Sequence, residues 1–157
     1  MKYSNELVCN LLDYIELNLY SKISIDNLAC KFSYDRYYLM KLFKKELGIS
    51  IIDYVNHLRI YNCILQIQST DYSFTRIAIN CGFYSLEYFS EMFHKVMGIS
   101  AKEYRFYTRN RYLRKQKNES ILLENWFNLQ KLCEKIDKYK KNRKPNKFPT
   151  LKRSIFD

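Results

Sequence analysis

The chain has 157 residues, of which 47% are hydrophobic, and a net charge of +11, which suits a folded protein with a polyanionic partner and argues against a disordered chain. Only three glycines and two prolines occur, and no apolar run reaches the ~18 residues of a membrane helix, so we expect an all-α protein outside the membrane. Five cysteines without a C-x-x-C pair and only two histidines argue against a zinc site and indicate reduced thiols in a cytoplasmic protein, for which we expect no metal and no cofactor.

The positive charge is concentrated in the last third of the chain. Residues 1–109 contain 13 Lys and Arg against 11 Asp and Glu, a net charge of +2. Residues 110–157 contain 14 against 5, a net charge of +9. We therefore separate a nearly neutral body, residues 1–109, from a basic extension and tail, residues 110–157.

The body begins with short helical patterns. An apolar stripe at helical spacing predicts a helix that packs on the first unit: Leu7, Leu11, Leu12, Ile15 and Leu19. Ser24 is an N-cap residue type before a short helix that ends at Phe32, and Asp35 is one before a helix that runs to Leu47. Gly48 then ends this helix, because glycine adopts the left-handed backbone of a helix C-terminus without strain. The first unit, residues 7–50, is thus helix, tight turn, helix and stop.

This arrangement occurs twice. Residues 37–54 and 87–104 align without a gap at an offset of fifty, and seven of the eighteen positions are identical, among them Gly48/Gly98. Upstream the offset is forty-nine, so the second turn holds one additional residue, which we assign to Cys81-Gly82-Phe83. A period seen only twice indicates an internal duplication, with the second unit over residues 69–109.

Residues 51–68 connect the two copies and contain neither glycine nor proline. Ser50 with Asp53 resembles a capping box that opens this segment, and Ser100 with Glu103 opens the helix after the second copy. Apolar residues lie on more than one face of residues 51–68, as expected for a linker helix that packs on both units. At 1.5 Å per residue the helix is about 27 Å long.

The extension contains one more helical pattern, over residues 119–139. Its apolar stripe has five members: Leu122, Leu129, Leu132, Ile136 and Tyr139. Three interpretations are open: the stripe docks on the body, which is the default, pairs with a second chain in a homodimer, or holds a ligand. The basic, proline-bearing residues that follow, up to Asp157, are typical of a poorly ordered arm.

The second copy, IAINCGFYSLEYFSEMFHKVMGISAKEYR, resembles the signature of the AraC/XylS family of bacterial transcription regulators. That signature runs I-A, then G-F, a small residue, an aromatic pair, F-K (with His94 here in place of lysine), G and finally Y-R. The first copy, IDNLACKFSYDRYYLMKLFKKELGIS, is similar to the first helix-turn-helix of the family. The resemblance implies two helix-turn-helix subdomains joined by a linker helix. It also implies a sequence-specific regulator, an activator, that binds double-stranded DNA through two recognition helices in successive major grooves and works with RNA polymerase.

The resemblance also assigns DNA-facing residues. On the first recognition helix the base-facing residues are Arg36, Tyr37, Met40 and Lys41, and the phosphate-facing residues are Lys44 and Lys45. On the second, the base-facing residues are Leu86, Glu87, Ser90 and Glu91, and Lys95 faces phosphate. Carboxylates can accept from cytosine but repel phosphate, so we expect the first unit to dominate binding.

An interpretation from another class is a helical protein-interaction module that keeps the fold without tight DNA binding, because Glu87 and Glu91 weaken the second unit. The salt dependence of duplex binding separates the two interpretations. An enzyme is not expected. The two carboxylates are one helical turn apart, but no acid or base partner accompanies them.

Overall fold

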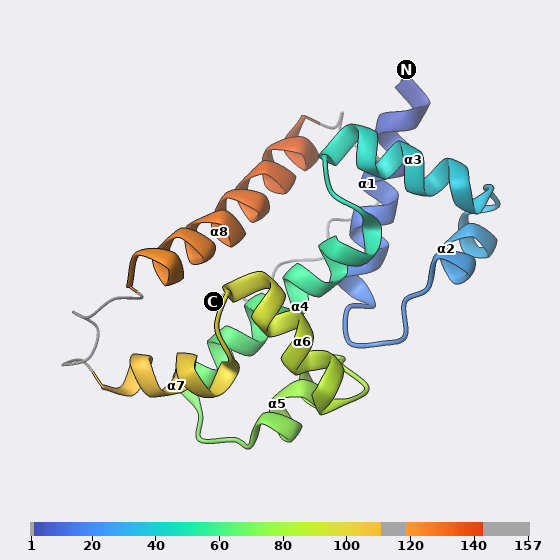
Figure 1. The fold of residues 1–157 in the computed structure, drawn as a ribbon. Helices are drawn as coiled ribbons and strands as arrows, with labels where there is room; N and C mark the ends of the chain where they lie inside the picture. The colour runs from blue at the N-terminus through green and yellow to red at the C-terminus, as the bar shows by residue number, and fades with distance from the viewer. Residues whose placement is uncertain (1, 111–118, 143–157) are drawn as a thin grey trace.

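The computed structural model describes residues 2–110 and 119–142, which hold helices and no strand (Figure 1). The predicted all-α fold is confirmed. In chain order the helices are α1 Lys2–Leu17, α2 Ile25–Phe32, α3 Arg36–Leu47, α4 Ile51–Ser69, α5 Phe74–Asn80, α6 Leu86–Met97, α7 Ala101–Arg109 and α8 Glu119–Lys141. None of these helices is long and apolar enough to cross a bilayer. The start of the predicted arm is helical, because α8 continues to Lys141, and the part of the arm beyond residue 142 lies outside the described residues.

Local capping fixes where the helices begin and end. The side chains of Ser24, Asp35 and Ser85 accept backbone hydrogen bonds at the starts of α2, α3 and α6, as predicted. Gly48 and Gly98 follow α3 and α6 with φ of 77° and 75°, which confirms the two glycine stops.

The two capping boxes differ in completeness. At α7 the box is closed, because Glu103 reaches back to the backbone N–H of Ser100 at 2.9 Å. At α4 the shorter Asp53 instead accepts from the Ser50 hydroxyl at 2.7 Å. Only the longer side chain reaches the backbone donor that a full capping box requires.

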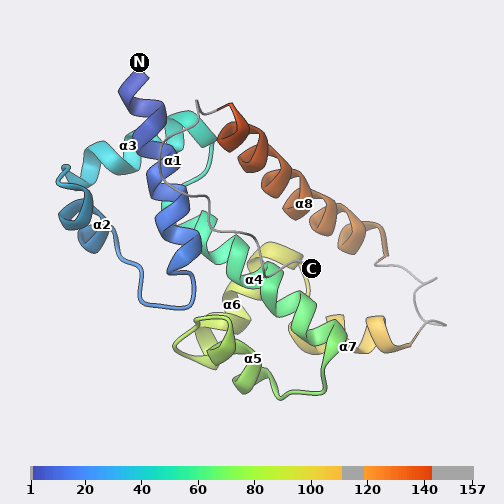
Figure 2. The same ribbon diagram turned by 180° about the vertical axis from the view of Figure 1, so that it is seen from behind.

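The buried residues form two hydrophobic cores, one in each helix-turn-helix unit. α1, α2 and α3 surround the first core, and α5, α6 and α7 surround the second. Figure 2 shows α4 running between the two groups of helices. Its N-terminal half contributes to the first core through Ile51, Tyr54 and Val55, and its C-terminal half contributes to the second through Ile60, Cys63, Ile64 and Ile67.

The duplication is visible in matching contacts inside the two cores. The rings of Phe43 and Tyr54 lie 5.8 Å apart in the first unit, and those of Phe93 and Tyr104 lie 5.8 Å apart in the second. All four residues belong to the sequence repeat at an offset of fifty. The two aromatic pairs therefore hold the helix after each glycine stop against the helix before it.

The additional residue of the second turn lies one position later than predicted. The left-handed Ser33 and Gly82 correspond at an offset of forty-nine, with φ of 57° and 85°. The next amides also correspond, because Tyr34 N–H donates to Ala29 and Phe83 N–H donates to Ala78, 3.1 and 2.9 Å from the carbonyl oxygens. The turns match through Phe83, and the caps of α3 and α6 differ by fifty, so the added residue is the exposed Tyr84. The prediction that residues 81–83 contain the added residue was wrong, because corresponding backbone hydrogen bonds close both turns as far as Phe83.

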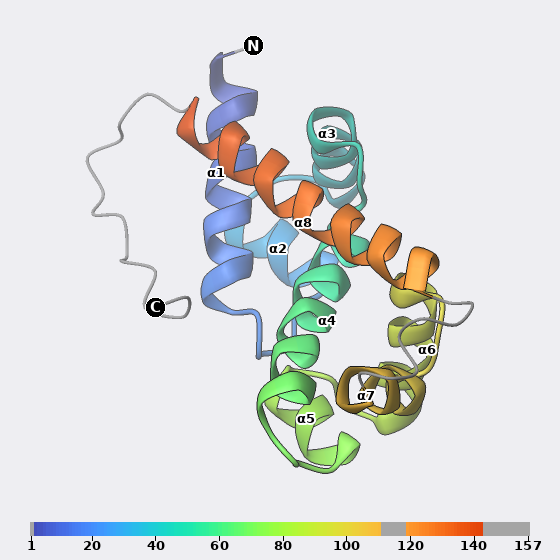
Figure 3. The same ribbon diagram turned by 90° about the vertical axis from the view of Figure 1, so that its left-hand side faces the viewer.

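Helix α8 lies across both units. Its Leu129 is buried in the second core and its Ile136 in the first. These residues are seven positions apart, or two helical turns, and therefore share one face. Figure 3 shows α8 passing from α6 toward α1. Of the three interpretations of this stripe, the structure shows docking on the body.

Candidate DNA interface

Helix α3 separates an apolar face from an open polar face. Leu39, Leu42 and Phe43 are buried in the first core, as the period predicts. The opposite face is exposed, with Tyr37 at 70% and Met40 at 41% of their accessible surface. The structure places all the predicted DNA-facing residues of this helix on its exposed face: Arg36, Tyr37, Met40, Lys41, Lys44 and Lys45.

The N-terminal end of α3 is held by its neighbours. Asp35 accepts from the backbone N–H groups of Tyr37 and Tyr38 at 2.9 and 3.0 Å. The guanidinium of Arg36 lies over the Tyr37 ring and 3.1 Å from the carboxylate of Asp26. Ion pairs between exposed side chains contribute little to stability, so Arg36 can exchange Asp26 for an acceptor on DNA at small cost.

Helix α6 also has an open face, but its chemistry differs. Leu86, Glu87, Ser90 and Glu91 are all exposed, so the structure brings these predicted residues together. The Ser90 hydroxyl donates to the carbonyl oxygen of Leu86 at 2.7 Å. Ser90 can therefore only accept from a base while this bond is kept. With two carboxylates beside it, this face offers no strong attraction to phosphate.

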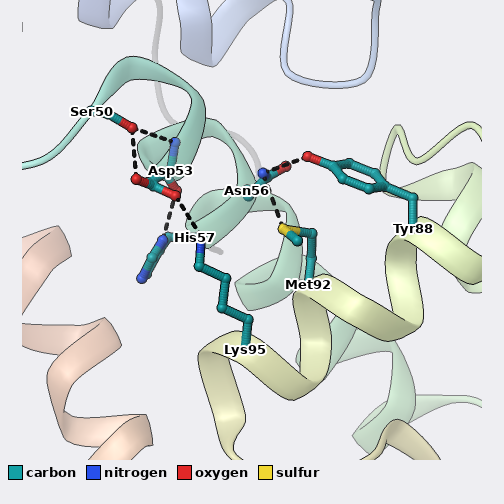
Figure 4. Close-up of polar contacts among 7 residues, drawn as sticks. All are labelled: Ser50, Asp53, Asn56, His57, Tyr88, Met92 and Lys95. Atoms are coloured by element: carbon teal, nitrogen blue, oxygen red, sulfur yellow. Dashed lines mark hydrogen bonds and ion pairs between the residues drawn. The ribbon is translucent and has the colours of Figure 1, made fainter.

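Lys95 lies at the contact between α6 and the linker helix α4 (Figure 4). Its ammonium is 3.1 Å from the carboxylate of Asp53. The hydrogen bond from Ser50, and then Lys95 itself, hold the pKa of Asp53 below its ordinary value. The charge of Lys95 is thus partly neutralised where a phosphate contact was predicted.

The sequence analysis did not single out Asn56, which is buried on the same face of α4. Its amide donates to the Tyr88 hydroxyl at 2.8 Å and to the Met92 sulfur at 3.4 Å (Figure 4). Together with the Lys95 contact, these bonds fix how α6 lies on the linker helix. The sequence did contain an indication of this role. Asn56 is a polar residue in a mainly apolar helix and follows Asp53 by three positions, which places the two side chains on one face.

Arg59 is the second buried polar residue that the sequence analysis did not single out, and it joins the units. Its Nε donates to the carbonyl oxygen of Leu19 at 2.9 Å, and its second guanidinium nitrogen donates to Ser21 at 2.8 Å. The turn of the second unit also packs against this segment of the first unit. A Cβ added at Gly82 would lie 2.9 Å from the carbonyl oxygen of Leu19 and from the Cα of Tyr20. The first unit therefore packs directly on the second at this point.

A family model described as a helix-turn-helix domain matches residues 28–106, from α2 through most of α7. The HTH-type transcriptional activator AarP of Providencia stuartii is 28% identical over 104 residues, which cover 66% of this chain and 77% of AarP. The chain belongs to the AraC/XylS family of transcription regulators. It is a DNA-binding regulator and not an enzyme.

Solved structures agree with the family membership. The C-terminal domain of AraT, a response regulator from Geobacillus stearothermophilus, is 30% identical with a TM-score of 0.60, and the match covers 64% of this chain and 84% of that one. The DNA-binding domain of AdpA, solved with a target DNA, shares the fold with a TM-score of 0.62 and 21% identity over 67% and 95% of the two chains. Three further curated relatives are matched over 36 to 48% of their length.

The AraC/XylS signature ends in a Tyr-Arg pair whose role here is structural. The Tyr104 hydroxyl accepts from the side chain of Gln68 at 2.8 Å, at the end of the linker helix. Arg105 donates to the carbonyl oxygen of Tyr72 at 2.7 Å and lies over the Phe74 ring. Both residues of the pair thus hold the connection between α4 and α5, which positions the second helix-turn-helix.

Proposed function

We propose that this regulator binds double-stranded DNA sequence-specifically, with α3 and α6 as recognition helices in successive major grooves. One observation carries the proposal: both helices bury the repeat-matched face and leave the opposite face open, and on α3 that face carries Arg36, Lys41, Lys44 and Lys45. Arginine and lysine at the N-terminal half of such a helix can donate to guanine, and those farther along can meet phosphates.

The linker helix supports the two-groove arrangement. α4 has 19 residues, which at 1.5 Å each give about 28 Å. Successive major grooves on one face of B-DNA are about 34 Å apart. A continuous helix of this length, packed into both cores, is long enough to support two recognition helices at a separation of that order. The first unit supplies most of the affinity, because the open face of α6 carries Glu87 and Glu91.

We further propose that the protein activates transcription, as the name of AarP suggests, and that it does so in the cytoplasm together with RNA polymerase. A homodimer through residues 119–139 would have to form through the side chains of α8 that stay exposed when this helix is docked on the body. Leu129 and Ile136 are buried, whereas Phe127 is 52% exposed. Sedimentation at micromolar concentration tests this pairing, and a monomer would contradict it.

Selection of bound duplexes from a random DNA pool tests the function. We expect a motif with two conserved parts about 10 base pairs apart, the more strongly conserved part being read by α3. Binding should weaken steeply with salt, because each phosphate contact contributes about 0.9 to the slope of log K against log salt. A flat salt dependence and an unenriched pool would support the protein-interaction module instead.

A further inference from the structure

Helix α8 contacts the same backbone position in both repeats. The ammonium of Lys135 donates to the carbonyl oxygen of Leu47 at 2.7 Å, and the amide of Asn125 donates to that of Met97 at 2.9 Å. Leu47 and Met97 are the last residues of α3 and α6 and correspond at the offset of fifty. One helix therefore caps the C-terminal ends of both helices that we propose to enter DNA.

These carbonyls need an external donor. The last carbonyls of a helix have no partner within the helix. The amides of Gly48 and Gly98 already donate to the carbonyls of Lys44 and His94, three positions before Leu47 and Met97. The cation of Lys135 is also favoured at a helix C-terminus, where the backbone dipoles leave partial negative charge. The two contacts are thus specific caps rather than incidental surface contacts.

Further contacts extend α8 over both units. Trp126 stacks on Tyr61 of α4, with centroids 5.4 Å apart and planes 7° from parallel. The Tyr139 hydroxyl donates to Glu46 at 3.1 Å, and burial, together with this bond, raises the pKa of Tyr139. Lys140 pairs with Glu16 of α1 at 2.7 Å. α8 therefore binds α1, α3, α4 and α6.

Between the two caps Leu129 is buried in the second core and Leu132 packs against the first, with a pocket beside them. This open pocket has a volume of about 310 Å³ and is lined by Gly48, Val96, Leu132 and both capping residues. The two caps are the polar contacts that α8 makes with the helix ends around this pocket. Their loss is expected to loosen the hold of α8 on these ends, while Leu129 and Ile136 keep the helix docked.

We propose that α8 is a brace that fixes the relative orientation of α3 and α6, with Lys135 and Asn125 as positioning residues. The effect of this brace on DNA affinity rests on the proposed two-groove binding. A protein whose two recognition helices already have the bound orientation loses less conformational freedom when it binds. The brace acts on DNA binding without touching DNA.

The first test measures the brace without DNA. Nitroxide labels are placed at Lys44 and His94, which are exposed and correspond in the two repeats. They are attached to a ketone-bearing amino acid, so that the native thiols are not labelled. Pulsed electron paramagnetic resonance then gives the distribution of distances between the two labels. In the double variant Lys135→Met with Asn125→Ala, the distribution should be at least about twice as wide as in the parent. An unchanged width would overturn the proposal.

Matched variants keep this test specific. Lys131 and Asn128 are exposed residues of the same types on α8, so Lys131→Met with Asn128→Ala should leave the width unchanged. Lys135→Arg retains a charged donor and should keep the narrow distribution. If α8 detaches in the double variant, Lys135→Met and Asn125→Ala are measured separately, and each should broaden the distance distribution. A broader distribution in the control pair would overturn the proposal.

The second test uses duplexes from the selection. The double variant should bind a duplex with both motif parts about tenfold more weakly, and a duplex with only the α3 part less than twofold more weakly. Equal losses on both duplexes would overturn the role of the brace in two-groove binding. If the parent binds no duplex, the proposed function fails, while the distance measurement still judges the brace.

Discussion

The ammonium of Lys95 lies 3.1 Å from Oδ1 of Asp53, whereas Lys45, its counterpart fifty residues earlier, forms no ion pair with any residue that the structure describes. The asymmetry has a simple origin. The linker helix lies against α6, so the face of the second copy that carries Tyr88, Met92 and Lys95 contacts Asp53 and Asn56. The duplicated helices thus present the same residue types in different surroundings.

The two lysines should therefore contribute unequally to DNA binding. Lys45→Ala should weaken binding to any duplex and lower the salt slope by about 0.9, the value for one phosphate contact. Lys95→Ala should lower the slope by less than half as much, because its charge is partly neutralised by Asp53. Titrations of a random duplex at several salt concentrations measure both slopes, and equal changes would show that Lys95 leaves Asp53 on binding.

Arg36 is expected to read a base. Arg36→Ala should cost about 1–3 kcal/mol on the selected motif and relax its preference at one position. Equal losses on random and selected duplexes would make Arg36 a phosphate contact instead. Asp26→Asn is the matched control: it releases Arg36 from its ion pair without changing α3. This control should bind the motif as tightly as the parent or slightly more tightly, and competition binding measures both variants.

Gly82 should tolerate substitution less well than Gly48. Both have positive φ, so alanine is strained at either position. At Gly48 the nearest atom to an added Cβ is the flexible Lys135 ammonium at 3.3 Å, whereas at Gly82 it is backbone at 2.9 Å. We expect Gly48→Ala to lower the free energy of unfolding by about 1 kcal/mol.

Gly82→Ala adds overpacking to strain and should cost about 2–4 kcal/mol in the same measurement. Urea denaturation of both variants gives the comparison. Gly48→Val should lose more than about 1 kcal/mol, since a β-branched residue is poorly suited to a left-handed backbone. Similar losses for Gly48→Ala and Gly82→Ala would mean that the loop at Leu19 moves away without cost.

The terminal residues 143–157 contain five Lys and Arg and one Asp, a net charge of +4. Their removal leaves Lys140 and its ion pairs to α1 in place. It should weaken binding to all duplexes alike and flatten the salt slope by about 0.9 for each phosphate that the segment neutralises. A full-length variant with the five basic residues changed to glutamine separates charge from length. An unchanged slope in both would exclude binding of this segment to the DNA backbone.

The sequence predicted the helices and their limits closely. Caps such as Asp35 and glycine stops such as Gly48 bind backbone groups within about four residues, so the pattern that predicts them is the pattern that forms them. The period of Leu39, Leu42 and Phe43 likewise predicts which face of α3 is buried. The remaining face of each recognition helix could therefore be predicted to be exposed.

Only the tertiary structure decided what those faces and ends contact. Lys95 binds a residue 42 positions away, Asn56 one 32 away and Lys135 one 88 away, and no local pattern encodes such partners. Gly82 matched a turn residue by sequence, but its need for glycine also comes from the approach of Leu19 and Tyr20. Local hydrogen bonds set the helices, and the packing of α4 and α8 against both units set which charges stay open to solvent.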